Sequence, residues 1–419
     1  MIEEQYKAII KEELALALGC TEPIAIAYLA ALSRDTLNNI PDKIVIKCSG
    51  NIIKNVSGVV VPNCNGLKGI AASVAIGIMG GKAENKLEVL SNVTQSNIKS
   101  AIEYLNKDII EIKVLDTTHP LHLIIESANE DNIATVEIVD RHTNVVKITK
   151  NNEVVFNKEN TLNTNTQQTD RSILNIKDIV EFVETADLSE LTPLIEKEIE
   201  CNTKISKEGL NNKWGACVGK NLLLYYGNDI TIRAKATAAA GSDARMSGCT
   251  LPVMINSGSG NQGMTLSLPV IEYAKEWKKT PQETIKALVL SNLVAIEQKS
   301  LIGPLSAYCG VVNAACGAGA AITYLDGGTL TQIENTITNV LANVSGIICD
   351  GAKPSCAIKI ASAIDAAIMG HNLSMHNTVF KPGEGIVKNN IKETIKGVST
   401  IAKDGMKETD QTILNVMIN

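Results

Sequence analysis

Aromatic residues are scarce in this sequence, because Phe, Trp and Tyr together make up only 3% of its 419 residues. Glycine is common, with 30 residues, and alanine is abundant beside it. A core of small and aliphatic side chains lets helices approach one another closely. The sequence therefore predicts closely packed helices. Its length exceeds that of one ordinary core, so we expect two or three domains.

Clustered basic residues are also missing. The formal net charge is −6, and no block of Lys or Arg occurs. Nucleic acids are bound through such blocks, so they are excluded as the main partner. Residues 1–7 lack the basic-then-apolar order of a secretory signal, which predicts a cytoplasmic protein. In that compartment we expect the ten cysteines to be buried thiols with a few metal or catalytic ligands, rather than disulfides.

Charge is absent from residues 300–325, a stretch long enough to span a bilayer. Its residues are largely Gly, Ala, Ser, Cys, Asn and Tyr, and such a segment inserts less readily than one rich in Leu, Ile or Phe. A buried, closely packed helix is therefore favoured over a membrane span, and we expect a soluble protein without a membrane partner.

Hydrophobic periodicity predicts an α+β fold. A helix is expected over residues 3–18, with Gly19 as its stop, and a second helix begins at Thr21. Short alternating or apolar runs then predict antiparallel strands, with helices between the earlier ones. The expected strands are 43–47, 109–114, 121–125, 134–139 and 145–148, and the expected helices are 69–80 and 98–105.

Four regions follow from this pattern. Residues 1–39 are expected to be N-terminal helices that carry Cys20 and pack on the C-terminal domain. Residues 40–156 form the mixed α+β domain with antiparallel strands. Residues 157–172, polar and rich in Asn and Thr, are predicted to be a linker. Residues 173–419 are expected to be a mainly helical domain, which would be the catalytic one.

The strongest local signal for chemistry is Cys349-Asp-Gly-Ala-Lys-Pro-Ser-Cys356. Gly351 and Pro354 predict a turn that lets both thiols face one point. A helix is expected to begin at Cys356, and a helix N-terminus favours the thiolate that binds metal. The alternative is a pair of buried cysteines flanking a turn. A third ligand could be Cys309 or Cys316, which share one helix face, and the residues themselves do not choose between them.

Cys20 lies just before the second predicted helix. The positive end of the helix dipole would favour a reactive thiolate, whereas the neighbouring Glu22 would raise the pKa of Cys20. A small buried residue at a turn between helices is the alternative.

The segment Gly258-Ser-Gly-Asn-Gln-Gly263 matches a dinucleotide fingerprint by letter, but no parallel βαβ unit surrounds it. A glycine loop before a helix suits a small anion such as a carboxylate, with Ser259, Asn261 and Gln262 as substrate-binding candidates. Arg245 could clamp a carboxylate or pair with Asp243, and the salt bridge is slightly favoured. A glycine turn without a ligand is the alternative.

Taken together, four motifs resemble the L-cysteine desulfidase family, which is related to the iron–sulfur L-serine dehydratases. They are Gly19-Cys-Thr-Glu-Pro23, Ser257-Gly-Ser-Gly-Asn-Gln-Gly263, Tyr308-Cys-Gly310 and the Cys349–Cys356 segment. The likeness runs from about residue 5 to beyond residue 385. In this family a [4Fe–4S] cluster takes the place of pyridoxal phosphate in β-elimination.

The resemblance implies that Cys309, Cys349 and Cys356 hold the cluster, and it selects Cys309 over Cys316. Cys20 would be the proton-abstracting thiolate or a reversible ligand of the fourth iron, with Thr21 and Glu22 beside the substrate. The serine dehydratases place more residues between their last two ligands, and some end in a cysteine. This chain ends Asn415-Val-Met-Ile-Asn419, which favours the desulfidase branch and leaves the fourth iron open.

The expected activity is therefore elimination from L-cysteine, a small amino acid, to give pyruvate, ammonia and sulfide. One alternative is L-serine or another β-substituted amino acid on the same scaffold. A second is a pyridoxal phosphate lyase, although no lysine has a supporting context. A third is a non-catalytic iron–sulfur or zinc protein. The oligomeric state stays open, with a homodimer as one candidate.

Overall fold

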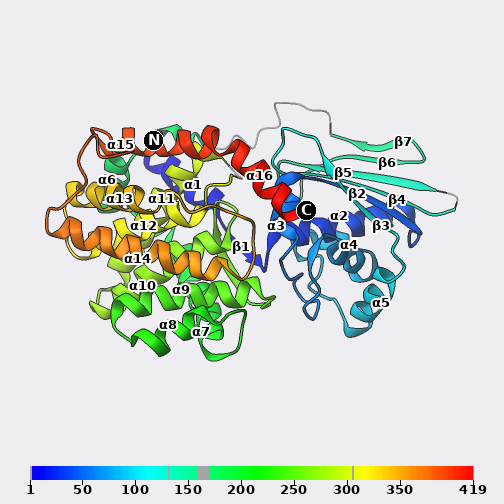
Figure 1. The fold of residues 1–419 in the computed structure, drawn as a ribbon, viewed down its shortest axis with the longest axis horizontal. Coiled ribbons are helices and arrows are strands. Elements are labelled where there is room, and N and C mark those ends of the chain that lie inside the picture. Colours follow the sequence, from blue (N-terminus) through cyan, green and yellow to red (C-terminus); the bar gives the residue numbers. More distant parts are fainter. Residues whose placement is uncertain (1, 131, 159–168, 304–305, 419) are drawn as a thin grey trace.

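Figure 1 shows a chain divided into two lobes in the computed structural model, which describes residues 2–130, 132–158, 169–303 and 306–418. The sheet lobe consists of residues 21–157, and the helical lobe consists of residues 2–18 and 169–405. Each lobe has a hydrophobic core of its own. The candidate polar site described below is lined by residues from both lobes.

A six-stranded sheet dominates the sheet lobe, in the order β3-β2-β4-β5-β6-β7. Its strands are β2 (Lys43–Ser49), β3 (Ile110–Leu115), β4 (His122–Ala128), β5 (Ile133–Val139), β6 (Val145–Lys150) and β7 (Glu153–Asn157). Neighbouring strands are antiparallel except β2 and β3, which are parallel. The predicted α+β fold with antiparallel strands is confirmed. Strand β7 was not predicted, because its five residues are all exposed and show no alternation of burial.

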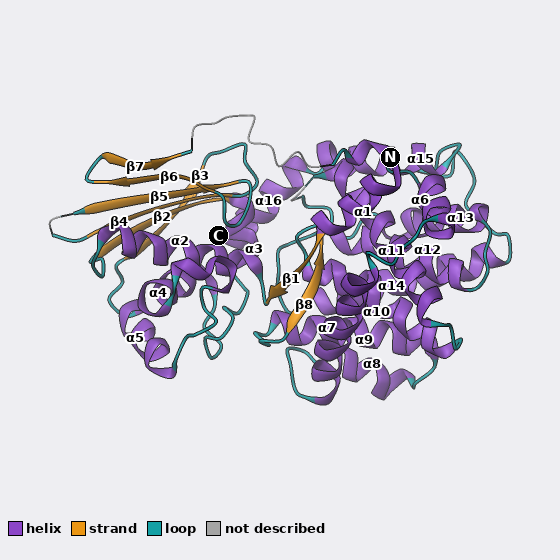
Figure 2. Cartoon of the chain, turned by 180° about the vertical axis from the view of Figure 1, so that it is seen from behind, coloured by secondary structure: helices purple, strands orange, loops and turns teal. Residues whose placement is uncertain are grey.

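One face of this sheet is covered by helices (Figure 2). Residues in β4 and β5 alternate between fully and partly buried, as expected for strands with one face in a core. Their buried side chains pack with α2 (Thr21–Leu37) and α4 (Gly69–Gly80). The parallel pair β2–β3 needs a long crossover, which is supplied by α3 (Gly50–Val56), α4, η1 (Ala83–Glu88) and α5 (Gln95–Leu105).

The helical lobe is a bundle in which two central helices are buried along most of their length. Its helices from residue 169 onward are η2 (Arg171–Ile173), α6 (Ile176–Thr185), α7 (Thr192–Asn211), α8 (Val218–Tyr226), α9 (Ile230–Met246), α10 (Gly260–Glu276), α11 (Pro281–Ile302), α12 (Gly310–Leu325), α13 (Leu330–Val344), α14 (Cys356–Met375), α15 (Ile391–Thr400) and η3 (Ile401–Gly405). The central pair is α10 and α12. A Cβ on Gly317 of α12 would lie 2.3 Å from the carbonyl oxygen of Ser291 on α11, so glycine allows this close approach.

Most of the uncharged stretch 300–325 is this buried helix α12. Within the part of the chain that the structure describes, no helix is long and apolar enough to cross a membrane.

The N-terminal segment differs from the single predicted helix. Helix α1 (Ile2–Glu13) ends early, and β1 (Leu14–Leu18) pairs antiparallel with β8 (Pro252–Asn256). The run Leu14-Ala-Leu-Ala-Leu18 alternates with a period of two as well as fitting a helix face. The distant strand β8 decides the outcome, because it supplies backbone partners that a sequence window does not contain.

The predicted packing of residues 1–39 also needs correction. Helix α1 packs in the core of the helical lobe, but α2 belongs to the core of the sheet lobe. Helix α2 has apolar, buried side chains on all of its sides, and it packs against β4, β5 and α4. The two N-terminal helices are therefore divided between the lobes, with Cys20 at the crossing point.

The C-terminal helix makes a second connection between the lobes. Helix α16 (Lys407–Ile418) leaves the helical lobe and lies against α3 (Figure 1), so residues 173–419 are not confined to one lobe. Most of the predicted linker, residues 159–168, lies outside the described residues. Near the end of this predicted linker, Arg171 forms ion pairs with Glu12 and Glu13 of α1, at 2.5 and 2.6 Å.

Candidate active site

A pocket of about 200 Å³ lies where the two lobes meet. The sheet lobe and the turn before it contribute Cys20, Glu22, Lys54 and His142, and the helical lobe contributes the Ser257–Gln262 loop and three cysteines. A cavity of this size suits a small molecule better than a drug-sized ligand. Of the ten predicted site residues, nine line this pocket; Thr21 is the exception, and its hydroxyl donates a hydrogen bond to Glu22, at 3.2 Å.

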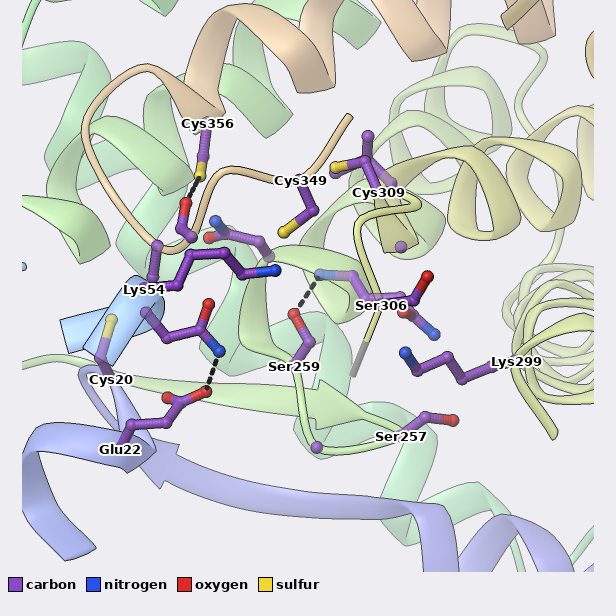
Figure 3. A pocket seen from close by; sticks show the side chains of 18 of the residues that line it. Cys20, Glu22, Lys54, Ser257, Ser259, Lys299, Ser306, Cys309, Cys349 and Cys356 are labelled. Carbon is purple, nitrogen blue, oxygen red and sulfur yellow. Dashed lines mark hydrogen bonds between the residues drawn. The ribbon is translucent and has the colours of Figure 1, made fainter. Parts of the chain in front are cut away.

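The three predicted ligand cysteines lie along one side of the pocket (Figure 3). Cys309 precedes α12, Cys349 follows α13, and Cys356 is the first residue of α14. Backbone pairing between the segments sets the first two side by side. The amide of Cys309 donates to Ile347 O at 3.1 Å, and the amide of Cys349 donates to Ala307 O at 2.6 Å. Cys316, the rival candidate, is fully buried in α12 and does not line the pocket.

The turn between Cys349 and Cys356 forms as the sequence predicts. Gly351 has a φ of +92°, a conformation that glycine adopts without strain. A Cβ on Gly351 would lie 2.1 Å from the carbonyl oxygen of Lys54, so the turn also needs glycine for space. The thiol of Cys356 is turned back toward the Gly351 carbonyl oxygen, 3.7 Å away.

Cys349 is the thiol of this group that ionises most readily. The hydrogen bond from Cys309 and the nearby Lys54 and Lys359 lower the pKa of Cys349 to about 6, against the effect of burial. The hydrogen bond to Cys349 and burial raise the pKa of Cys309. Burial likewise raises the pKa of Cys356. Within the pair Cys309–Cys349, the hydrogen bond therefore favours the thiolate on Cys349 and the thiol on Cys309.

These cysteines fit the donor chemistry of an iron–sulfur cluster. Among the described residues, no group of three Cys, His, Asp or Glu side chains is arranged to hold a single metal ion. A cluster spreads its thiolate ligands over several iron atoms, so its ligands need not converge on one point. Three thiols from three separate segments line one pocket, and one of them ionises below neutral pH.

Cys20 lies beside Glu22 (Figure 3), and Cys356 is near enough to contribute to the raised pKa of Cys20. Cys20 is the residue before α2 and is buried, with 2% of its surface exposed. Burial raises the pKa of Cys20 to about 12, while Arg245 lowers it and Glu22 raises it. The helix N-terminus was expected to favour a thiolate, but the cost of burying a charge outweighs that effect. Cys20 is therefore a thiol at neutral pH.

The glycine loop forms the start of α10, as predicted, after strand β8. Ser257 and Gly258 have φ values of 48° and 80°, and the hydroxyl of Ser259 accepts a hydrogen bond from the amide of Gln262, at 3.3 Å. Because β8 pairs only with antiparallel β1 in its two-stranded sheet, the dinucleotide fold is absent here. Ser259, Asn261 and Gln262 line the pocket at the N-terminus of α10, and a helix N-terminus suits a carboxylate.

Arg245 is buried beside this loop but does not form the expected salt bridge. Its guanidinium donates to Asn261 Oδ1 at 3.2 Å and to Gly19 O at 3.0 Å. Among the described residues no ion pair joins Arg245 to Asp243, whose carboxylate instead accepts the amide of Gly219 at 3.1 Å. The two residues are two positions apart on α9, and side chains at that spacing point in different directions.

A chain of buried amides reaches the pocket from the interior. Gln262 Nε2 donates to Asn256 Oδ1 at 2.8 Å, and Asn256 Nδ2 donates to Asn292 Oδ1 at 2.8 Å. Asn292 Nδ2 then donates to Glu198 Oε2 at 3.0 Å. Burial raises the pKa of Glu198 to about 8, so its carboxyl group is largely protonated at neutral pH. This chain fixes the orientation of the Gln262 amide.

Several pocket residues were not found from the sequence. Lys54 is on α3 and is 2% exposed, His142 is in the turn between β5 and β6, and Lys299 is near the end of α11. No motif marks these positions, because each belongs to an ordinary helix or hairpin. Only the meeting of the lobes brings them together.

Comparison with known proteins gives a consistent picture. The family model of the serine dehydratase alpha chain matches residues 84–415. A UPF0597 protein of Lachnoclostridium phytofermentans is 52% identical over 411 residues, covering 98% of this chain and 98% of that protein. UPF0597 proteins of Desulfitobacterium hafniense and Treponema denticola are 49% and 48% identical, each covering 99% of this chain and 97% and 98% of their own lengths.

Proposed function

Because the chain belongs to the serine dehydratase alpha-chain family, we propose that it is an iron–sulfur lyase that eliminates hydrogen sulfide from L-cysteine. The overall reaction converts L-cysteine and water to pyruvate, ammonia and hydrogen sulfide. One observation carries the proposal: Cys309, Cys349 and Cys356 line the same small pocket as Cys20 and the N-terminus of α10.

Cys309, Cys349 and Cys356 would hold a [4Fe–4S] cluster. When bound, this group supplies an iron with an open coordination position, which acts as a Lewis acid toward the sulfur that leaves. Three protein thiols leave that position free for substrate. A soft sulfur ligand suits such an iron better than the hydroxyl oxygen of serine, which favours cysteine as substrate.

The remaining pocket residues bind and orient the amino acid. The carboxylate would lie at the N-terminus of α10, near the Ser259 hydroxyl and the side chains of Asn261 and Gln262. Arg245 adds a buried positive charge behind Asn261. Glu22 is an acceptor for the α-ammonium group and is held by Asn55, at 3.4 Å.

Cys20 belongs to the proton transfers of this pocket. With a pKa of about 12, Cys20 keeps its proton at neutral pH, so it could take up another proton only after losing its own. Elimination also needs a base for the α-proton, which is poorly acidic in an amino acid.

L-Serine is the second candidate substrate, because the matching family model is that of the serine dehydratase alpha chain. The two substrates differ only in the leaving atom, so the same pocket would serve both. Their products distinguish them, since only cysteine yields sulfide.

The test is a product assay on anaerobically purified protein loaded with iron and sulfide. We expect equal amounts of sulfide and pyruvate from L-cysteine, and a rate with L-serine at least tenfold lower. If the protein forms pyruvate from L-serine but no sulfide from L-cysteine, L-serine is the substrate. If neither amino acid gives a product, the proposed function is wrong. Cys309→Ala is expected to lose bound iron, whereas Cys316→Ala keeps it. The reverse result would contradict the ligand assignment.

A further inference from the structure

His142 lines the pocket and has a titratable ring, one nitrogen of which lacks a hydrogen-bond partner among the described residues. It lies in the turn between β5 and β6 and lines the pocket on the sheet-lobe side, with Cys20 and Glu22. Its Nε2 is shielded from solvent and has no hydrogen-bond partner among the described residues. A shielded polar atom without a partner costs stability, so it needs an explanation in a native fold.

Other histidines of this chain do not share this feature. His122 Nε2 lies 2.8 Å from Glu137 Oε1, and its Nδ1 lies 3.0 Å from Thr117 Oγ1. His119 Nδ1 lies 2.8 Å from Asp140 Oδ1, and His371 Nδ1 lies 3.1 Å from Thr323 Oγ1. These rings are held by the fold. The Nε2 of His142 is left for something that enters the pocket.

Burial of His142 favours the neutral form of its ring. Burial lowers the pKa of His142, and the carboxylate of Glu22 on α2 acts in the opposite direction. Asp140 lines the pocket from the same hairpin, while Lys54, Arg245 and Lys299 line it from α3, α9 and α11. A neutral imidazole carries a lone pair on one nitrogen and can accept a proton. The Cys20 thiol, which also lines the pocket, is protonated at neutral pH and cannot do so.

The position of His142 also suits the stereochemistry of elimination. The three cysteines come from the helical lobe and His142 comes from the sheet lobe, so they approach the pocket from different lobes. In an anti elimination, the base and the group that accepts the leaving atom act on opposite faces of the substrate. A base in the sheet lobe meets that requirement when the leaving sulfur is directed to the cysteines.

We propose that His142 is the general base of the elimination, with Nε2 as the atom that takes the α-proton. This inference rests on the proposed function. Nε2 forms a new N–H bond, and the Cα–H electron pair becomes the Cα=Cβ double bond. The Cβ–S bond breaks, and the sulfur leaves with its electron pair. The imidazolium then returns the proton to water, and Nδ1 carries the ring's other proton throughout.

The first test compares His142→Gln with His376→Gln, an exposed histidine outside the pocket. Both loaded variants should keep the iron content and absorption spectrum of the parent protein. For His142→Gln we expect kcat to fall at least a hundredfold with KM changed less than threefold, and exchange of the substrate α-proton with deuterated water to be lost. In His142→Gly, added imidazole should restore part of the rate, which a structural role would not allow.

A second measurement needs neither the cluster nor turnover. The chain has five histidines, so ring resonances of the cluster-free protein can be assigned by single substitutions. We expect the His142 ring to titrate below the usual pKa of about 6.5 and to shift when L-serine is added, whereas His376 stays unchanged. An unchanged His142 signal with L-serine contradicts the proposal even if His142→Gln does not fold.

The two proposals fail in different ways. If the parent protein forms neither sulfide nor pyruvate, the proposed function fails, and with it the role of His142 in that reaction. If the parent protein is active and His142→Gln keeps its rate and its α-proton exchange, only the assignment of the base fails. Loss of α-proton exchange in Cys20→Ala but not in His142→Gln would assign the base to Cys20 instead.

Discussion

Arg245 on α9 donates a hydrogen bond from Nη2 to the carbonyl oxygen of Gly19, 3.0 Å away. This bond ties the helical lobe to the turn that carries Cys20 into the pocket. The same guanidinium holds Asn261 at the start of α10. One buried side chain therefore connects the two walls of the site, although its partners are 226 and 16 residues away in the sequence.

Replacing Arg245 should therefore loosen the junction between the lobes. Arg245→Met keeps much of the side-chain volume but removes two hydrogen bonds from a charged donor, so we expect the free energy of unfolding to fall by about 3 kcal/mol. It should also raise the pKa of Cys20 further, because Arg245 lowers it. Urea unfolding and the pH dependence of Cys20 alkylation measure the two effects.

Arg233→Met is the matched control, because Arg233 is on the same helix and forms partly exposed ion pairs with Glu272 and Glu276. This substitution should lower the free energy of unfolding by less than about 1 kcal/mol. Equal losses in the two variants would mean that Arg245 has no special role at the junction.

Gly351→Ala should displace the turn between Cys349 and Cys356. The new Cβ would meet the carbonyl oxygen of Lys54 at 2.1 Å, and a φ of +92° is unfavourable for alanine. We expect a loss of about 2 kcal/mol or more in cluster-free protein, and at least a twofold fall in bound iron after loading. Thermal unfolding and iron analysis measure these effects. Gly346→Ala, with no atom within 4 Å and no positive φ, should change neither.

Asp410→Ala should weaken the attachment of α16 to the sheet lobe. Asp410 pairs with Lys54, whose side chain is only 2% exposed. Without that partner the Lys54 ammonium is buried and unpaired, and we expect the free energy of unfolding to fall by about 3 kcal/mol. Asp404→Ala removes a surface pair with Lys407 in which both side chains are well exposed, and should cost less than about 1 kcal/mol. Urea unfolding of both variants measures these changes. Similar losses of unfolding free energy in the two variants would refute the prediction.

Glu198→Gln should change how stability depends on pH. Burial raises the pKa of Glu198 from 4.5 to about 8. The folded state then keeps a proton that the unfolded state releases, so this group's contribution to stability is full below about pH 4.5. It decreases as the pH rises to about 8 and is constant above that. A glutamine at this position does not titrate, so the variant should gain stability relative to the parent over this range, by at most about 5 kcal/mol.

Unfolding measured at several pH values between about 4 and 9 tests this prediction. Glu200→Gln is the control, since Glu200 is on the same helix but its pKa is lowered by Lys197. The Glu200 variant should show no such gain between about pH 5 and 8. If the free energies of unfolding of the Glu198 variant and the parent protein differ by the same amount at every pH, Glu198 does not bind a proton on folding.

Local structure at the site was predictable where nearby residues determine it. The turn at Gly351, the helix that begins at Cys356 and the glycine loop before α10 all depend on residues within a few positions. The strands of the sheet lobe were predictable for the same reason, because alternation is visible within about five or six residues. Strand β1 was not, because its alternation also fits a helix and its partner β8 begins at Pro252.

The sequence by itself determined the α+β fold class, the turn between two cysteines and the residue types available for chemistry. The tertiary structure decided which of those residues meet: Cys309 rather than Cys316 faces the pocket, and Lys54 and His142 join it from the sheet lobe. It also decided that Cys20 is a thiol, because burial outweighs the helix dipole. The physical reason is the separation along the sequence over which each interaction acts. Turns and periodicity depend on neighbours along the chain, whereas burial, charge and pocket membership depend on segments far apart in the sequence.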